Sequence, residues 1–417
     1  MKIVEKYNNT SLILRIICGL IIGIVLGITF DGLNFIPLLG TIFVGALKAI
    51  APVLVFVLVI SALAQGNDKL DRRFGLVIFL YVLSTLLASF VAVVGSFLFP
   101  QTLILTETAK ADVIPEGIGQ VLSNLLLNMV SNPVDSLVKG QYIGILFWAI
   151  VFGLAAKKLA SDNTKKVFSD ISEIVSMAVK WIINLAPFGI MGLVYSNVSE
   201  NGLSIFTDYG KLILLLVVCM LSVSLIVDPL LIALVLKTNP YPLVWRCLKE
   251  SGVTAFFTRS SAANIPVNME LCDKLGMDRE MYAVSIPLGA TINMDGAAIT
   301  IAIMSLAAAN TVGINVSFGS ALILAFIATL GACGASGVAG GSLLLIPMAC
   351  SLFGVHADVA MQVVAVGFII GVVQDSLETA LNSSGDVMFA ATAEYAQWKK
   401  DGKSLPKFLG GNTDTKI

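Results

Sequence analysis

Acidic and amide side chains gather near the end of this chain, directly after an apolar run. Asp375, Thr379, Asn382 and Asp386 are spaced at i, i+4, i+7 and i+11, so on a helix they share one face. Glu378 lies one residue off that line. Ionisable residues inside a membrane are costly and are by default functional. The alternative is a helix that has left the bilayer and carries a solvated acidic stripe.

A second polar motif, Asn293-Met294-Asp295-Gly296, interrupts an otherwise apolar segment. Asn, Asp and Gly tolerate the backbone angles of an unwound turn. Such a turn frees carbonyl oxygens, which together with carboxylates and hydroxyls are the ligands that a hard cation prefers. A kink with one buried acid paired elsewhere is the plainer interpretation. Because the motif lies between two interrupted segments and precedes the acidic helix, we favour a cation site.

The composition is that of a membrane protein. Of the 417 residues, 57% are hydrophobic and 13% are charged, whereas a soluble domain averages about 25% charged residues. The net charge of −1 lacks the basic excess that is typical of nucleic-acid-binding proteins. The six cysteines include no CxxC pair, which argues against a disulfide framework or a zinc site. The single histidine, His356, rules out a histidine-based catalytic cluster within the membrane.

Several apolar segments are long enough to cross a bilayer, which takes about 20 residues. They lie at about 12–30, 37–65, 74–99, 141–160, 167–198, 209–237, 280–309 and 357–393. Two further apolar segments, at about 241–276 and 317–352, are interrupted by small and polar residues. Lys and Arg cluster after the second, fourth and last spans, so the positive-inside rule predicts that both termini are cytoplasmic.

That orientation requires each interrupted segment to enter and leave the membrane on one side, the first from the cytoplasm and the second from outside. We therefore predict an all-α polytopic membrane protein with eight transmembrane helices and two oppositely oriented re-entrant helical hairpins. The hairpin tips would be 259–266 and 334–342, which are rich in Ser, Ala and Gly. Paired interrupted segments of opposite orientation are typical of a transporter site near the bilayer midplane. Taken alone, the second tip could equally be a small-residue interface between ordinary helices.

Other intramembrane or flanking charges receive plainer interpretations. Lys48, Asp135 and Asp228 are interpreted as snorkelling or interfacial side chains.

Taken in chain order, the first tip, the Asn-Met-Asp-Gly motif, the second tip and the polar face of the last helix resemble the dicarboxylate/amino acid:cation symporter family, which contains glutamate transporters and their neutral amino-acid relatives. The resemblance covers nearly the whole chain, from residue 39 to Asp386. Ser-Ala-Ala-Asn-Ile-Pro at the first tip and Gln-Asp-Ser-Leu-Glu-Thr-Ala-Leu-Asn-Ser-Ser on the last helix are similar to the bacterial sodium-coupled serine/threonine branch. The resemblance implies a glutamate-transporter-like fold, Na⁺ as the co-transported ion, and a homotrimer in the cell (inner) membrane.

The same resemblance implies how the chain is divided. Residues 1–208 would mainly form the scaffold and trimer contacts through spans 1, 2, 4 and 5, while span 3 (74–99) would belong to a mobile transport unit. Residues 209–393 would form the rest of that unit, with span 6, both hairpins, span 7 and span 8. Residues 394–417 would be a polar cytoplasmic tail.

The site residues are also implied by resemblance. Substrate would be bound by both hairpin tips and the last helix: Ser260, Ser261, Val338, Gly341, Asp375, Glu378, Thr379 and Asn382. Asp375 would receive the substrate's ammonium, and Asn382 with the backbone around Ser261 its carboxylate. One sodium site would be formed by Asp386, Asn382 and the carbonyls of Gly289 and Asn293. A second would be formed by Thr291, Met294 and carbonyls near Cys333 and Ala335. A third would be formed by Tyr81, Ser84, Thr85, Asn293 and Asp295.

This sequence departs informatively from the glutamate carriers, which place an Arg where this chain has Glu378. A carboxylate at that position would repel aspartate or glutamate as substrates. An unpaired acid at this depth is costly, so we expect Arg259 to pair with Glu378 or Asp375.

The function predicted from these residues is sodium-coupled secondary active symport of small neutral amino acids, serine and threonine first, by alternating access of the mobile unit. The protein would not be an enzyme. Two alternatives remain open: an intramembrane aspartyl protease using Asp295 and Asp386, and a proton-coupled amino-acid carrier of the same fold. The protease is disfavoured because Asn293 and Asn382 suit cation coordination better.

Overall fold

The computed structural model describes residues 10, 12–30, 32–33, 35–65, 72–105, 126–127, 129–139, 141–202, 205–333 and 340–415. The described residues are predominantly helical, with no strand among them and one isolated β-bridge between Pro406 and Thr413. The all-α prediction is therefore confirmed for this part of the chain.

One group of helices comes from the first half of the chain and packs mainly within itself. α2 packs along α9, while α3 packs against α7, α8 and α9. Glycines allow the α2–α9 approach, because a Cβ on Gly23 would lie 2.7 Å from the carbonyl oxygen of Met191. These helices are α2 (Leu12–Thr29), α3 (Phe35–Ala64), α6 (Pro133–Lys139), α7 (Tyr142–Leu159), α8 (Asp162–Ile183) and α9 (Ala186–Asn201).

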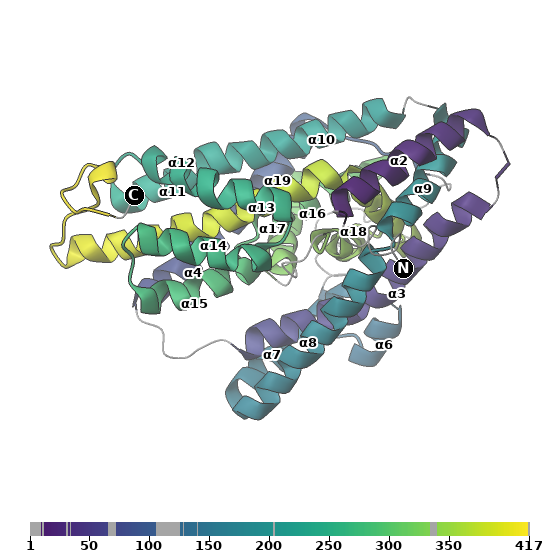
Figure 1. The fold of residues 1–417 in the computed structure, drawn as a ribbon. Helices are drawn as coiled ribbons and strands as arrows, with labels where there is room; N and C mark the ends of the chain where they lie inside the picture. Colours follow the sequence, from purple (N-terminus) through teal and green to yellow (C-terminus); the bar gives the residue numbers. More distant parts are fainter. Residues whose placement is uncertain are drawn as a thin grey trace.

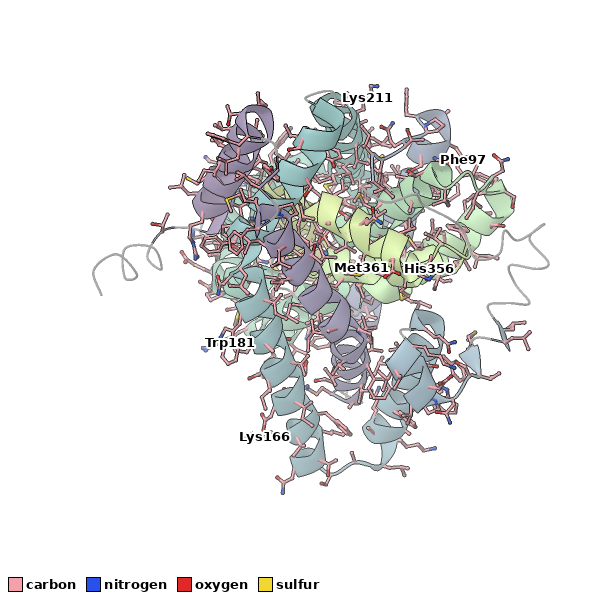
Figure 2. All side chains as sticks on the ribbon, turned by 90° about the vertical axis from the view of Figure 1, so that its right-hand side faces the viewer. Phe97, Lys166, Trp181, Lys211, His356 and Met361 are labelled. Carbon is pink, nitrogen blue, oxygen red and sulfur yellow. The ribbon has the colours of Figure 1, made fainter. Side chains whose placement is uncertain are left out.

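The predicted fifth span, 167–198, is two helices and not one. α8 ends at Ile183, α9 begins at Ala186, and the pair is bent by 49°. Pro187 stands in the first turn of α9, where proline is tolerated because its missing N–H has no partner in the helix. In Figure 2, the beginning of α8, marked by Lys166, lies at the lower edge of the molecule, away from Met361 of α19.

A second group of helices surrounds α19 (Ala357–Lys400), a 44-residue helix. α4 (Arg72–Leu98) packs against α16, α17 and α19, although it is far from them in sequence. In Figure 1, α19 runs lengthwise through this group, beside α13 and α16. The other members are α10 (Ile205–Ser222), α11 (Asp228–Leu236), α12 (Tyr241–Cys247), α13 (Val253–Thr258), α14 (Ser261–Lys274), α15 (Arg279–Ile292), α16 (Asp295–Thr311), α17 (Phe318–Ala332) and α18 (Ile346–Ser351).

The first interrupted segment forms a helical hairpin. The chain turns at Arg259, whose φ of 52° lies in the left-handed region, between α13 and α14. Asn264 Nδ2 lies 3.0 Å from Ser251 Oγ, and Lys274 Nζ lies 3.1 Å from Glu250 Oε2. A continuous helix would separate residues 24 apart by about 36 Å, so α14 folds back along the helices that precede it.

The second interrupted segment also folds back on itself. α17 contacts α18 and the 3₁₀ turn Ser342–Leu345 that precedes α18. Gly331 lies directly against the side chain of Met348. Residues 334–339 of the second tip lie outside the described residues, and with them the predicted site positions Ala335 and Val338.

The outer surface is that of a multi-pass membrane protein. Four described helices are long and apolar enough to cross a bilayer, and a fifth is reached if the bent α8–α9 pair counts as one span. Large apolar side chains are exposed along α2, α3, α10 and α11, where lipid would cover them.

The C-terminal residues are less detached than a free tail. α19 continues past the predicted end of span 8, at 393, to Lys400. Beyond it, Leu409 is buried in a cluster with Leu243 and Cys247 of α12. The Arg246 guanidinium lies 4.4 Å from the centre of the Phe408 ring. These contacts hold the chain end against the base of the first hairpin.

Candidate substrate and cation site

The site is built where the unwound turn of residues 293–294 and the tip of the first hairpin meet α19. α15 ends at Ile292 and α16 begins at Asp295, so Asn293 and Met294 leave the helical conformation, with φ/ψ of −92°/84° and −125°/50°. The unwound turn predicted from Asn-Met-Asp-Gly is thus present. Asn293, Met294 and Asp295 are all buried, which puts their polar atoms in the interior of the protein.

Asp375 is held by two donors from the two hairpins. Its Oδ2 accepts a hydrogen bond of 2.6 Å from Arg259 Nε, and its Oδ1 accepts one of 3.1 Å from the Gly340 N–H. The side chains of Arg259 and Asp375 are only 8% and 3% exposed. The predicted pairing of Arg259 is therefore confirmed with Asp375 as the partner. This carboxylate already binds a nitrogen cation in a buried setting.

Glu378 has a different set of neighbours from Asp375. Its Oε2 accepts hydrogen bonds from Thr300 Oγ1 (2.8 Å), from Ser342 Oγ (2.9 Å) and from Gln374 Nε2. These donors come from α16, from the last residue of the second tip, and from α19 itself. The acid is thus satisfied by neutral donors and does not use Arg259. No described residue donates to its Oε1.

Asn382 and Thr379 lie on the same buried side of α19. Asn382 Oδ1 accepts the Gly296 N–H at 2.8 Å, and its Nδ2 lies 3.4 Å from Met294 Sδ. A thioether is a weak acceptor, so this amide N–H can be donated to a better one. The Thr379 hydroxyl donates to the Asp375 carbonyl of its own helix.

Asp386 marks one end of this polar face. Its Oδ1 accepts from Asn293 Nδ2 at 3.1 Å, and the same Nδ2 donates to the Asn382 carbonyl at 3.0 Å. Asp386 Oδ2 and Asn293 Oδ1 are buried without a hydrogen-bond partner among the described residues. Gly289 permits the close approach, because a Cβ there would lie 2.6 Å from Asp386 Oδ1. Unpaired buried oxygens at this point suit a cation.

Asp295 faces α4. Ser84 Oγ lies 2.7 Å from Asp295 Oδ2, and Thr85 Oγ1 lies 2.8 Å from Asp295 Oδ1. Thr85 Oγ1 also accepts the Met294 N–H at 3.2 Å. Tyr81, one turn earlier on α4, donates to the Asp386 carbonyl at 2.9 Å. The structure therefore brings Tyr81 to the Asp386 end and Ser84 and Thr85 to Asp295.

The remaining predicted residues are less central. Ser260 caps α14 by accepting the Ala263 N–H, and Ser261 is the buried first residue of that helix. Gly341 is buried beside the described end of the second tip. Thr291 is exposed and donates to the Leu288 carbonyl. Cys333 Sγ lies 3.3 Å from the Ile292 carbonyl.

A profile of the sodium:dicarboxylate symporter family matches residues 12–395. The chain belongs to this family. Among its relatives, the serine/threonine transporter SstT of Bifidobacterium adolescentis is 63% identical over 98% of this chain and 95% of its own length. The proteins of the same name from Streptococcus agalactiae and Streptococcus thermophilus are 56% and 53% identical, each over 96% of this chain and 99% of their own length. The resemblance inferred from the motifs is confirmed.

The structure of this symporter adds site residues that the sequence did not single out. Thr300, Ser342 and Gln374 hold Glu378. Only the position of Gln374, directly before Asp375, was a usable signal. Asp228 was interpreted as a snorkelling or interfacial charge, and that interpretation is wrong. It is 0% exposed, and its Oδ1 lies 2.8 Å from Ser84 Oγ.

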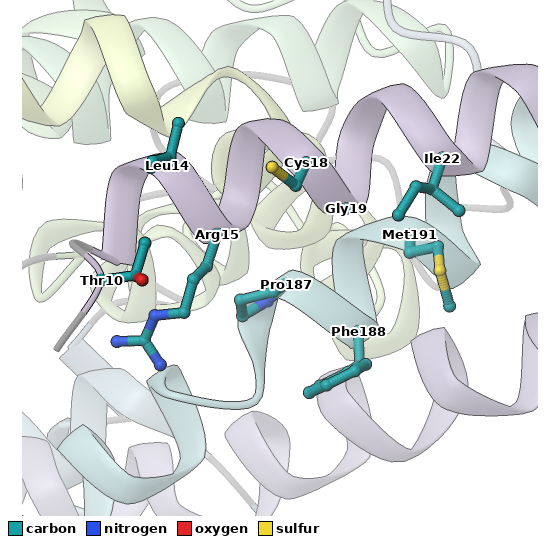
Figure 3. Close-up of a pocket in the computed structure, with 9 residues that line it drawn as sticks. All are labelled: Thr10, Leu14, Arg15, Cys18, Gly19, Ile22, Pro187, Phe188 and Met191. Atoms are coloured by element: carbon teal, nitrogen blue, oxygen red, sulfur yellow. The ribbon is translucent and has the colours of Figure 1, made fainter. Parts of the chain in front are cut away.

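A surface pocket of the symporter lies apart from the polar site. It is formed between the beginnings of α2 and α9, from Thr10, Leu14, Arg15, Cys18, Gly19, Ile22, Pro187, Phe188 and Met191 (Figure 3). Its lining is mostly apolar and includes no predicted site residue. It therefore does not compete with the cluster on α19 as the functional site.

Proposed function

We propose that this protein is a sodium-coupled symporter of small neutral amino acids, with serine and threonine as its main substrates. The observation that carries the proposal is the buried Asp375 carboxylate, which already takes a guanidinium nitrogen at 2.6 Å. An amino acid's ammonium has the same charge and the same donor type. Family membership and the names of the relatives point the same way, toward a transporter and not an enzyme.

The protein would bind the amino acid through its α-ammonium and α-carboxylate groups. The ammonium would pair with Asp375, either beside Arg259 or in place of it. Its carboxylate would accept from Asn382 Nδ2, which has only a thioether acceptor now, and from N–H groups at the start of α14, where the helix dipole favours an anion. Thr379 and Val338 would line the remaining space.

Glu378 would exclude acidic side chains. It lies one helical turn after Asp375 and is buried, so a second carboxylate from the substrate would meet a like charge in surroundings that screen it weakly. A neutral hydroxyl meets no such repulsion and can donate to an oxygen. This contrast supports serine and threonine over aspartate and glutamate.

Sodium would occupy oxygen-lined positions around the unwound turn. The first would use Asp386, Asn382 and carbonyls of Gly289 and Asn293, in keeping with the unpaired Asp386 Oδ2. The second would lie near Thr291 and Met294, with carbonyls around Cys333 and Ala335. The third would use Asp295, Ser84 and Thr85, with Tyr81 and Asn293. Na⁺, like other hard cations, prefers oxygen donors of this kind.

The architecture that goes with this function has eight spans and two re-entrant hairpins, with both termini in the cytoplasm. α4 and the helices from α10 to α19 would move as one transport unit against the scaffold of the other helices. The packing of α4 on α16, α17 and α19 supports this grouping. A homotrimer in the inner membrane follows from the family resemblance.

The protease alternative has no support in the geometry. Asp295 bonds to hydroxyls of α4, whereas Asp386 bonds to Asn293. No hydrogen bond joins the two carboxyl groups among the described residues, although a protease dyad shares a proton between close acids. Each acid instead has the polar neighbours expected of a cation ligand.

Uptake of labelled serine into proteoliposomes tests the proposal. We expect accumulation when a Na⁺ gradient is imposed and none when the gradient is collapsed. Threonine should compete, whereas aspartate and glutamate should not. Uptake that ignores the Na⁺ gradient and follows a pH gradient would instead identify the proton-coupled carrier.

A further inference from the structure

Asp228 is an acid that the sites described above do not use. It is the only acidic residue in the span Tyr209–Leu236, and it is completely buried. It directly follows a π-helical turn at Val223–Val227, and its N–H donates to the Val223 carbonyl. Turns of this kind inside helices frequently occur at functional sites. Charged residues within a membrane span are rare, almost always face the protein interior or a water-filled cavity, and are by default functional.

The contacts of Asp228 share one hydroxyl with Asp295. Ser84 Oγ lies 2.8 Å from Asp228 Oδ1 and 2.7 Å from Asp295 Oδ2. A serine hydroxyl has one hydrogen, so it can donate to only one of these carboxylates. Thr85 Oγ1 is in the same position, since it lies 2.9 Å from the Tyr81 carbonyl and 2.8 Å from Asp295 Oδ1. Two hydroxyl hydrogens therefore serve four acceptor oxygens.

The cluster also lacks positive charge. Asp228 Oδ2 is buried and has no hydrogen-bond partner among the described residues. None of the ion pairs between described residues includes Asp228 or Asp295. Two carboxylates in the interior are costly without a compensating cation. An oxygen-rich, hydrogen-poor cluster of carboxylates and hydroxyls is the environment that a hard cation requires.

We propose that Asp228 is a further ligand of the cation position at Asp295, Ser84 and Thr85, which thereby becomes a two-carboxylate Na⁺ site. The ion would lie between the two acids and compensate both carboxylates, which the single Ser84 hydrogen cannot do. It would join three helices, α4, α11 and α16, each of which supplies at least one ligand. This inference rests on the sodium coupling proposed above and names a residue that the coupling alone does not require.

The test measures Na⁺ binding to the purified full-length protein in the absence of any amino acid. The unfolding temperature is recorded while NaCl replaces choline chloride at constant ionic strength. Asp228→Asn keeps the shape of the side chain and removes its charge. We expect it to raise the half-saturating Na⁺ concentration at least about tenfold, since a unit charge within contact distance of an ion is worth more than that even at an effective dielectric constant of 20. The control is Asp135→Asn, which removes the charge of an exposed side chain on α6. This control should leave the half-saturating Na⁺ concentration unchanged.

Equal Na⁺ affinity in Asp228→Asn and wild type would overturn the inference. If the variant does not fold, crystals of the wild type soaked in Tl⁺ supply the answer through anomalous scattering. A peak within coordination distance of both Asp228 and Asp295 supports the proposal, and a peak at Asp295 alone refutes it. Absence of Na⁺-driven serine uptake by the wild type is a separate outcome that rejects the proposed function itself.

Discussion

The Arg259–Asp375 pair allows a measurable prediction, which is that the ammonium of the substrate displaces Arg259 from Asp375. In Arg259→Ala, Asp375 keeps only the Gly340 N–H as a donor, although its side chain is 3% exposed. Removing one partner of a buried ion pair costs about 3–5 kcal/mol of stability. We expect that loss in the unliganded variant. Saturating serine should reverse most of it, because the ammonium of the substrate supplies the missing cation.

The two halves of this prediction are linked by a thermodynamic cycle. If serine restores about 3 kcal/mol, it must bind the variant about a hundredfold more tightly than it binds the wild type, since the wild type must first give up its internal pair. Thermal or chemical unfolding with and without serine, at fixed Na⁺, measures both quantities. Arg259→Lys is the matched control, because it keeps the charge and should show neither effect at full size. A stability gap between Arg259→Ala and wild type that serine leaves unchanged would refute displacement.

Three further substitutions separate the roles assigned to the site. Asp375→Asn should abolish serine uptake while Na⁺-dependent stabilisation persists, because the amide cannot neutralise an ammonium; thermal unfolding with and without Na⁺ checks the second half. Glu378→Gln keeps an acceptor for its three donors and removes the charge, so serine uptake should continue while aspartate becomes a competitor, as measured by inhibition of labelled serine uptake. Gly296→Ala would place a Cβ 2.6 Å from the Glu378 Cα, which should separate α16 from α19 and cost both stability and uptake. Gly75→Ala, with nothing within 4 Å of the added Cβ, should leave both as in the wild type.

Local sequence chemistry predicted those parts of the site that depend on neighbouring residues. The unwound turn at Asn293 and Met294 follows from residues that tolerate non-helical backbone. The shared face of Asp375, Asn382 and Asp386 follows from the helical period alone. The pairing of Arg259 was predicted because a buried acid without a partner is costly. That cost leaves a buried acid with few possible partners.

The parts that sequence could not predict depend on distant residues. Asp228 is 144 positions from Ser84, and nothing beside it in sequence distinguishes an acid buried on another helix from one at a membrane surface. The donors to Glu378 pose the same difficulty. Thr and Ser in helices often bond to a carbonyl of their own preceding turn, as Thr311 and Thr379 do here. Only the packing of α16 against α19 decides that Thr300 reaches Glu378 instead.

Two amide side chains, those of Asn293 and Asn382, connect the proposed amino-acid and cation ends of the site. Asn382 Nδ2 lies 3.4 Å from Met294 Sδ and is the proposed donor to the substrate carboxylate, while the main-chain carbonyl of Asn382 accepts from Asn293 Nδ2. The same Asn293 nitrogen also donates to Asp386, one helical turn further along α19. A cation that pulls Asp386 toward itself therefore changes what Asn293 can give to Asn382, and a substrate carboxylate on Asn382 acts back on Asn293. Because such coupling is reciprocal in free energy, the factor by which Na⁺ tightens serine binding must equal the factor by which serine tightens Na⁺ binding. Asn293→Ala should reduce this shared factor, measured as the ratio of the serine Kd without and with Na⁺, and an unchanged factor would show that the two ends communicate by another route.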